Sequence, residues 1–368
     1  MKRKGLLYIR QFVSHVDMKK TAVIILNWNG WRDTCECIAS VRLNHNSDFQ
    51  LILIDNGSED DSLIQIKKFL LGQIYANTGP VQAGNKCYYS GSSKCLSVDT
   101  FENSRSLYEE DLLLISSAVN MGFARACNVG ITYSIKAGYE YTFLLNNDTT
   151  VNPGCIGALI QFLENHPDYH IASPIIYYYH NPEKIWYFGG KLTFTGRRLI
   201  YNENKDRQSL KNSTKEMTFI SGCALFAQTE VFNRYGLLAE RFFFGEEDYE
   251  FSWRMKENGI RMCAISDAVV YHKVSISNKR LFSEDRLPYM FIGYLNRFID
   301  RKIHTRSRFK YNIWRMVCCF YIFPKLIFIN RYPIIKISKM FRLLIKFSSQ
   351  YNCIDKKLFY EAKTLFKI

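Results

Sequence analysis

The sequence predicts an α/β fold in which a mostly parallel central sheet precedes a helical basic tail. Three observations support this prediction. Short β-branched apolar runs alternate with stretches of helical composition, and each run ends in a turn rich in Asn, Asp or Gly. Basic residues, by contrast, gather toward the C-terminus. With 368 residues, the chain is long enough for one large α/β domain and an appendage.

The first two predicted strands enclose a helix. Residues 21–28 and 51–54 are buried β-branched strands, and residues 33–43 between them have helical composition. Asp33 or Thr34 is the expected N-cap of that helix. Two buried strands joined by a helix indicate a parallel pair with a right-handed crossover, as in doubly wound sheets.

The same alternation continues with a strand at 112–116, a helix at 124–137 and a strand at 141–145. Residues 72–110, rich in Gly, Ser, Asn and Tyr, are expected to form a surface insertion or hairpin. The second half is less regular, with three expected features: hairpin strands within 186–200, an apolar run at 219–226, and a helix at 249–257 closed by Asn258 and Gly259.

Polar side chains follow the predicted strands. Asn27, Asp55, Asn120 and Asp148 each come where a strand ends. In open α/β sheets, ligands bind at the carboxyl ends of the strands. We therefore expect these four side chains to face one crevice.

The net charge of +15 lies almost entirely near the C-terminus. Residues 273–368 contain 21 Lys and Arg against 5 Asp and Glu, whereas the first 272 residues contain 28 against 29. A helix predicted at 334–347 has four basic side chains within an arc of about 120°: Lys336, Lys339, Arg342 and Lys346. Such a helix is expected to lie on an anionic membrane surface, although packing on the catalytic domain is an alternative. No nucleic-acid-binding motif accompanies the charge, so nucleic acid is not expected as a partner.

Several features indicate a cytoplasmic protein at the inner face of the membrane. The 11 cysteines are scattered without metal-ligand spacing, which suits a reducing compartment. Residues 1–20 form a basic N-terminal extension without the apolar run of a signal peptide. Residues 314–330 are apolar, but Arg315, Pro324 and Lys325 interrupt them, so the uninterrupted apolar stretch is shorter than the roughly 20 residues of a spanning helix.

Six segments, in order along the chain, resemble family 2 glycosyltransferases, especially the bacterial rhamnosyltransferase-like branch: 23–41, 53–62, 120–131, 144–154, 221–259 and 267–275. The resemblance implies a GT-A fold over residues 21–300, with 72–110 as an insertion and 301–368 as the basic tail. It also implies an inverting reaction with a nucleotide-sugar donor, a glycan or lipid-linked glycan acceptor and a divalent metal, Mg²⁺ or Mn²⁺.

Glycosyl transfer needs stabilisation of a diphosphate leaving group. Asp148 offers a hard carboxylate oxygen for a metal held mainly through substrate phosphates, and Asn146 and Asn147 precede it as in the rhamnosyltransferase-like members. His272 matches a family position that contacts the metal or diphosphate. The alternatives are an ordinary Asn-Asp turn and a structural histidine.

The reaction also needs a base for the acceptor hydroxyl. Glu247 and Asp248 resemble the Glu-Asp pair of the family, in which the Asp is usually the base, so Asp248 is the predicted base. The alternative is that these carboxylates only favour the start of a helix. Arg297 resembles a family Arg-Asn segment in altered order.

The remaining candidates are nucleotide-sugar contacts. Asp55 matches a family position that hydrogen-bonds the nucleoside, and Asn27, Asn29, Asn120 and Gly122 are further candidates, together with Asn146 and Asn147. Turn formation at the strand ends is the alternative for these residues. The rival to the enzyme hypothesis is a non-catalytic basic module that binds membrane or nucleic acid.

Overall fold

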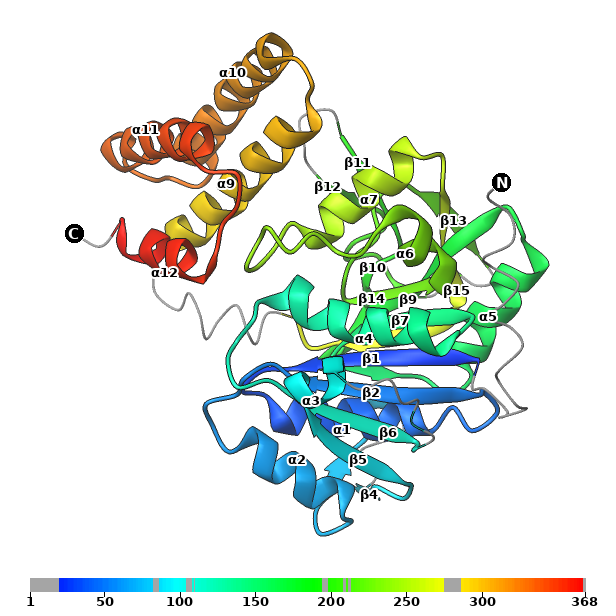
Figure 1. Ribbon diagram of the computed structural model, residues 1–368. Helices are drawn as coiled ribbons and strands as arrows, with labels where there is room; N and C mark the ends of the chain where they lie inside the picture. The colour runs from blue at the N-terminus through cyan, green and yellow to red at the C-terminus, as the bar shows by residue number, and fades with distance from the viewer. Residues whose placement is uncertain are drawn as a thin grey trace, which may run out of the picture.

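A computed structural model describes residues 20–81, 86–103, 108, 110–193, 198–207, 210, 213–274 and 286–366. Apart from residue 20, the predicted N-terminal extension lies outside this range, as does Ser275 at the end of the last resembling segment. The described chain forms an α/β layer and a helical unit at its side (Figure 1).

The central sheet is mixed, and its first half is parallel as predicted. Its strands lie in the order β13-β15-β9-β14-β7-β1-β2-β6-β5. Strands β7, β1, β2, β6 and β5 run parallel, and β14 is antiparallel to β7. The bounds are Thr21–Asn27 (β1), Phe49–Asp55 (β2), Ser93–Ser97 (β5), Leu112–Ser116 (β6), Tyr141–Asn146 (β7), Tyr169–Tyr178 (β9), Thr214–Met217 (β13), Ala224–Gln228 (β14) and Arg261–His272 (β15).

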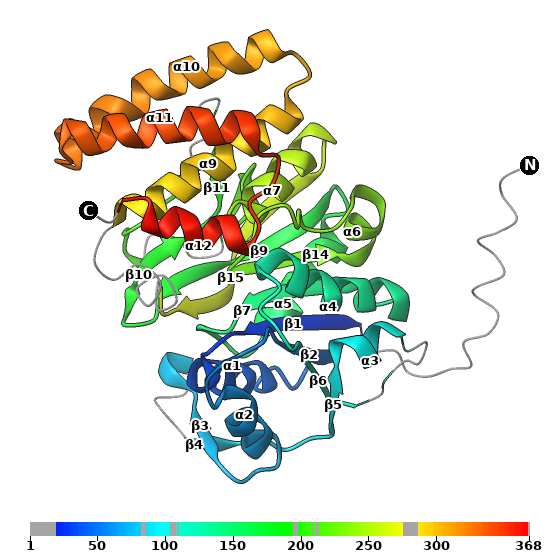
Figure 2. The ribbon, with the colours of Figure 1, turned by 60° about the vertical axis from the view of Figure 1, so that its left-hand side comes forward.

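Helices cover both faces of this sheet (Figures 1 and 2). Helix α1 lies on one face and α4 on the other, because the crossovers from β1 to β2 and from β6 to β7 run in opposite directions. The bounds are Trp31–Arg42 (α1), Ser62–Leu70 (α2), Val98–Asn103 (α3), Phe123–Ala137 (α4), Cys155–Asn165 (α5), Thr229–Tyr235 (α6) and Glu247–Glu257 (α7).

Helix α1 begins earlier than predicted. Its N-cap is Gly30, and neither Asp33 nor Thr34 has the capping role. The Thr34 hydroxyl donates instead to Asn27 Oδ1 at 2.6 Å, which ties the helix to the end of β1. The predicted N-cap was therefore wrong, and the Thr34 side chain makes a tertiary hydrogen bond instead of capping the helix.

The segment at 72–110 is only partly an insertion. Two short strands pair as a hairpin, as predicted, but β5 extends the main sheet beside β6. The predicted hairpin within 186–200 is confirmed by the pairing of β11 with β12. The short elements are Tyr75–Asn77 (β3), Gly79–Val81 (η1), Lys86–Tyr88 (β4), Thr149–Val151 (β8), Asn181–Tyr187 (β10), Gly190–Leu192 (β11) and Arg198–Ile200 (β12).

The C-terminal helices form a unit with its own core. They are Arg286–His304 (α9), Arg308–Pro324 (α10), a π-helical turn Lys325–Ile329 (η3), Ile334–Gln350 (α11) and Lys356–Thr364 (α12). Phe291, Trp314, Phe341 and Phe359 are buried in this second core. The domain boundary predicted at residue 300 falls inside α9, which belongs to the helical unit.

The apolar stripe of α11 does not face solvent. Ile337, Met340 and Leu344 are fully buried, and α11 packs against α9. Packing within the protein, the alternative to membrane contact, therefore accounts for this stripe. Membrane binding through that face would require α11 to leave its core.

Helix α10 and η3 form one continuous helix of 22 residues, Arg308–Ile329, whose most apolar window of 18 residues has a mean hydropathy of 1.4. By length and composition it is able to cross a membrane, although residues 314–330 alone were expected to be too short. Only 22% of its most apolar window is buried inside the protein.

Candidate active site

A cavity opens at the carboxyl ends of β1, β2 and β7. It lies where sequence analysis expected the crevice. Its walls include five predicted residues: Asn120, Gly122, Asn146, Asn147 and Asp148. His272 from β15 completes the predicted part of the lining.

Asp148 and His272 come together because two strands pair beside them. The chain turns after β7 into β8, and β8 pairs with β15 so that Thr149 lies opposite His272. The backbone nitrogen of Lys273 donates to the Asp148 carbonyl at 2.9 Å. His272 Nε2 consequently lies 3.1 Å from Asp148 Oδ1. Both residues are buried: Asp148 is 8% exposed and His272 is 6% exposed.

The charges of this pair support each other. Burial alone opposes ionisation of Asp148, but His272 holds the pKa of the carboxyl below its usual value. Burial likewise lowers the pKa of His272, yet Cys223 and Asp148 outweigh it and raise that pKa well above 6.5. An anionic carboxylate therefore faces the cavity, with its imidazole partner beside it.

These two side chains suit a metal held mainly by its substrate. No group of three or more His, Cys, Asp and Glu side chains gathers into a metal site in the described ranges. Mg²⁺ characteristically takes one or two carboxylates plus phosphate oxygens and water, and Mn²⁺ also accepts imidazole. One carboxylate and one imidazole at the cavity wall fit that pattern, and His272 would release its proton on binding.

Asn27 and Asp55 lie behind the cavity wall and not on it. Asn27 Nδ2 donates to Asp55 Oδ1 at 2.7 Å, and the Ser58 hydroxyl donates to the same oxygen at 2.6 Å. Asn29 accepts from the Glu59 backbone nitrogen at 2.8 Å. These hydrogen bonds stabilise the turns at the strand ends, which was the alternative role for the three residues. A direct contact between any of them and the nucleotide stays a prediction.

Asn56, which the sequence analysis passed over, does line the cavity. Its Nδ2 donates to Asn120 Oδ1 at 3.0 Å, and its Oδ1 accepts from the Met121 nitrogen at 2.9 Å. Gly122 has φ +89°, and a Cβ there would lie 2.7 Å from the Phe243 carbonyl oxygen. Gly122 is therefore required for the close approach of the two chain segments, whatever it contributes to binding.

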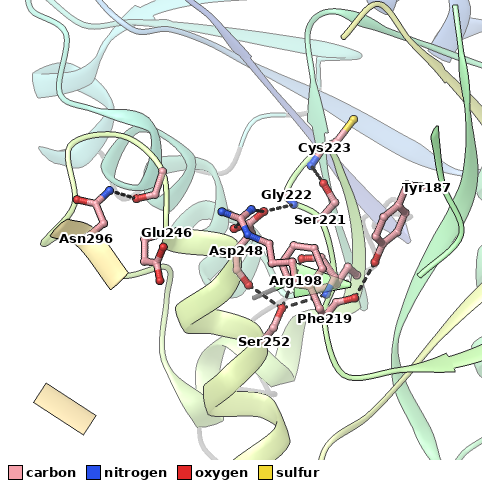
Figure 3. A network of polar contacts seen from close by, with 12 residues as sticks. Tyr187, Arg198, Phe219, Ser221, Gly222, Cys223, Glu246, Asp248, Ser252 and Asn296 are labelled. Atoms are coloured by element: carbon pink, nitrogen blue, oxygen red, sulfur yellow. Dashed lines mark hydrogen bonds and ion pairs between the residues drawn. The ribbon is translucent and has the colours of Figure 1, made fainter. Parts of the chain in front are cut away.

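Asp248 lies near the start of α7, where helix N-termini favour carboxylates. Arg198 Nη1 contacts both of its oxygens at 3.2 Å, and the Gly222 nitrogen donates weakly to Oδ2 at 3.5 Å (Figure 3). The Asp248 side chain is 12% exposed and that of Arg198 is 38% exposed. Arg198 thus covers the predicted base, and no feature of the sequence identified this arginine.

Glu247 is buried beside Asp248 and has an altered pKa. Burial, with a further contribution from the charge of Asp248, raises the pKa of Glu247 to about 8. Its Oε2 has no hydrogen-bond partner in the described part of the chain. Near neutral pH Glu247 therefore holds a proton, which leaves Asp248 as the better candidate for a base.

Helix α9 holds the loop before α7. Asn296 Nδ2 donates to the carbonyls of Phe244 at 3.0 Å and Gly245 at 2.8 Å. Arg297 pairs with buried Glu246, with Nη2 2.9 Å from Oε2. Glu246 has φ +93°, a left-handed conformation that is strained for glutamate and persists only where the surroundings hold it. Arg297 therefore acts on the site through Glu246.

The two carboxylates Asp148 and Asp248 lie at the same edge of the sheet. The short segment from Ser221 to Cys223 separates them: its Cys223 carbonyl accepts from the Asn146 nitrogen at 2.9 Å, and its Gly222 nitrogen faces Asp248. A donor sugar bound by one carboxylate would have its acceptor side close to the other.

Residues 107–286 match the family model described as glycosyltransferase like family 2. Residues 107–286, just under half of this chain, are thus similar to family 2 glycosyltransferases. The matched range includes β6, β7, the Asp148 turn, α7 and β15, so both carboxylates lie in it.

The relatives found by sequence comparison are distant. The dTDP-rhamnosyl transferase RfbF of Shigella flexneri is 26% identical over 165 residues, 45% of this chain and 53% of the relative. The low-salt glycan biosynthesis hexosyltransferase Agl10 of Haloferax volcanii is 25% identical over 205 residues, 54% of this chain and 63% of the relative. The aligned regions thus span between half and two thirds of these relatives.

A solved structure of GalNAc-T7 with UDP, GalNAc and Mn²⁺ is similar with TM-score 0.51 at 15% identity, over 94% of this chain and 57% of the other. At this identity the likeness shows the GT-A fold alone.

The cavity also has aromatic walls that sequence analysis missed. Trp28, Trp186 and Phe243 line it, and α12 contributes Phe359 and Tyr360. The last two belong to the segment expected to lie on a membrane. Phe243 N donates to the Ile354 carbonyl at 2.8 Å, which ties the segment before α12 to the loop before α7.

Proposed function

We propose that the protein is an inverting glycosyltransferase that moves a sugar from a nucleotide donor to a hydroxyl of a cell-surface or lipid-linked glycan. The observation that carries this proposal is the pair of carboxylates at one sheet edge, Asp148 with His272 in the cavity and Asp248 beyond the Ser221 segment. Asp148 is the single carboxylate among the described cavity-lining residues. One carboxylate to hold the donor and one to act as base is the set that direct displacement needs.

The roles follow from position. Asp148 and His272 would hold Mg²⁺ or Mn²⁺, which when bound would neutralise charge on the departing diphosphate. The wall of Trp28, Trp186 and Tyr360 excludes water from the donor. Asp248 takes the proton of the acceptor hydroxyl, for which Arg198 must first move away. The relative RfbF makes dTDP-rhamnose the first donor to examine.

Nucleotide binding is the direct test. Thermal unfolding with dTDP, UDP and GDP, each with and without Mn²⁺, should show stabilisation by at least one nucleotide, larger with Mn²⁺. The rival, a basic module without catalysis, predicts no stabilisation by any of them.

We further propose that the protein is cytoplasmic and lies on the inner face of the membrane, through α10 and not through α11. Exposed apolar side chains follow one face of the continuous helix: Phe309, Ile313, Met316, Val317, Phe320 and Phe328. Both views place α10 on the outer side of the helical unit, away from the sheet (Figures 1 and 2). Lys and Arg at its two ends suit anionic headgroups.

Vesicle sedimentation tests this placement. The Phe309→Ser, Phe320→Ser double variant should lose binding to phosphatidylglycerol vesicles, whereas the Lys346→Ser variant on α11 should keep most of it. Loss of binding only in the α11 variant would contradict the placement.

A further inference from the structure

A second cavity lies between the glycosyltransferase domain and the helical unit. The loop Phe244 to Glu246 and Arg198 form one wall, and α9, α10 and η3 form the other. Phe244 lines both cavities. Phe244 thus lies between the two cavities, and Arg198, the ion-pair partner of Asp248, lies in the wall of the second.

The walls of this cavity combine apolar surface with positive charge. Met290, Ile292, Phe298 and Ile322 provide aliphatic and aromatic surface. The charged side chains there are Arg198, Glu246, Arg297 and Lys325, of which Glu246 and Arg297 neutralise each other. An apolar chamber with excess positive charge is complementary to an anionic amphiphile.

Lys325 is the cation available to such a ligand. The described part of the chain gives it no ion-pair partner, unlike Arg198, whose partner is Asp248. Lys325 begins the π-helical turn that follows α10, and such turns are rare and frequent at functional sites. The helix that carries it has its exposed apolar face on the other side, so one helix borders both the cavity and the proposed membrane surface.

Gly293 keeps the chamber open. It lies in the middle of α9, where glycine disfavours the helix, and a Cβ added to it would meet nothing within 4 Å. Neither a turn nor a close backbone contact requires glycine there. The space in front of it belongs to the cavity.

We propose that this second cavity binds the lipid diphosphate part of the acceptor, with the apolar chain against α9 and α10 and the diphosphate at Lys325 and Arg198. The inference rests on the proposed function and names the acceptor class for the same site. An anion at Arg198 would compete with Asp248 for its guanidinium. Acceptor binding would thereby uncover the base, since the same arginine lies on Asp248 and in the cavity wall.

Farnesyl diphosphate is a suitable probe for the full-length protein. Calorimetric titration should show binding that Gly293→Leu and Lys325→Gln each weaken by about tenfold or more, an energy near 1.4 kcal/mol. Gly293→Leu fills the chamber without a steric clash at Cβ, so it should fold normally. Lys339→Gln, on the exposed side of α11, is the matched control and should bind like the unaltered protein. Farnesol and inorganic diphosphate should each bind more weakly than the intact probe.

Several outcomes would overturn the proposal. Unchanged affinity in Gly293→Leu would mean that the probe binds elsewhere, and competition by dTDP would place it in the first cavity. If dihexanoyl phosphatidylglycerol bound as tightly as farnesyl diphosphate, and the same two variants weakened its binding, the cavity would be a phospholipid site. Failure of the proposed function would look different. No nucleotide would then stabilise the protein, while farnesyl diphosphate would still bind, and Gly293→Leu and Lys325→Gln would still weaken that binding.

Discussion

The two carboxylates of the active site differ in how their counter-charges are held. His272, beside Asp148, is in a long strand whose pairing with β8 and β9 sets its position. Arg198, beside Asp248, is in a three-residue strand and is partly exposed. A fixed partner suits a group that binds a donor in every cycle, and a movable partner suits a base that must be uncovered. The difference separates a binding carboxylate from a reacting one.

The largest effect is expected at Asp248, where loss of the carboxylate tests whether this residue reacts while Asp148 only binds. The Asp248→Asn variant keeps the shape of the side chain but removes the proton acceptor, so transfer should fall by about 10²- to 10⁴-fold. Nucleotide-dependent thermal stabilisation should remain, because Asp148 is untouched. Sugar transfer measured beside thermal shift checks both halves, and full turnover in the variant would remove Asp248 from its role.

Breaking the Arg297 pair should have the next largest effect, on stability. Arg297→Gln leaves buried Glu246 without its partner, a change that typically costs about 3 to 5 kcal/mol. Denaturant unfolding measures the loss. The Arg301→Gln variant, one turn further along α9 and partly buried, is a comparison in which Glu246 keeps its partner, and an equal loss there would show that the Glu246 pair has no special weight.

Asp148→Asn should produce the converse of the Asp248 variant. Nucleotide affinity in the presence of Mn²⁺ should fall by about tenfold or more, while affinity without the metal changes little. Titration of dTDP with and without Mn²⁺ provides the measurement. Equal loss under both conditions would indicate that Asp148 maintains the structure of the cavity and does not hold a metal.

The sequence predicted the parallel half of the sheet well because its strands are continuous apolar runs, as in β1 and β2. Because strand ends gather at one edge, it also predicted that Asn27, Asp55, Asn120 and Asp148 would face one crevice. Asn120 and Asp148 do line the cavity, whereas Asn27 and Asp55 do not. His272 was expected there only from the family resemblance. Local patterns could not show Arg198 on Asp248, because that contact joins positions 50 residues apart through tertiary packing. Helix α11 is amphipathic as predicted, but its apolar side chains pack against α9 and do not face a membrane.

The second cavity was equally beyond sequence reasoning. Its walls come from β12, the loop before α7, and three elements of the helical unit. Gly293 and Lys325 are ordinary residues of a basic helical segment until packing places them around one space. The charge count located the basic region correctly. It could not show which helix face is exposed, because that depends on how the helices pack.

The smallest effect concerns Glu247, the neighbour of Asp248, and it depends on pH. Burial and Asp248 raise its pKa from 4.5 to about 8, so the folded protein holds this proton to a higher pH than the unfolded chain does. The stability that Glu247 contributes is therefore complete below pH 4.5 and is lost as pH rises through about 8. Glu247→Gln, which imitates the protonated form, should be more stable than the unaltered protein by on the order of 1 kcal/mol at the upper end of that range. Melting temperatures of both proteins across the range give the sign, and a Gln variant that gains stability toward low pH would place the proton elsewhere.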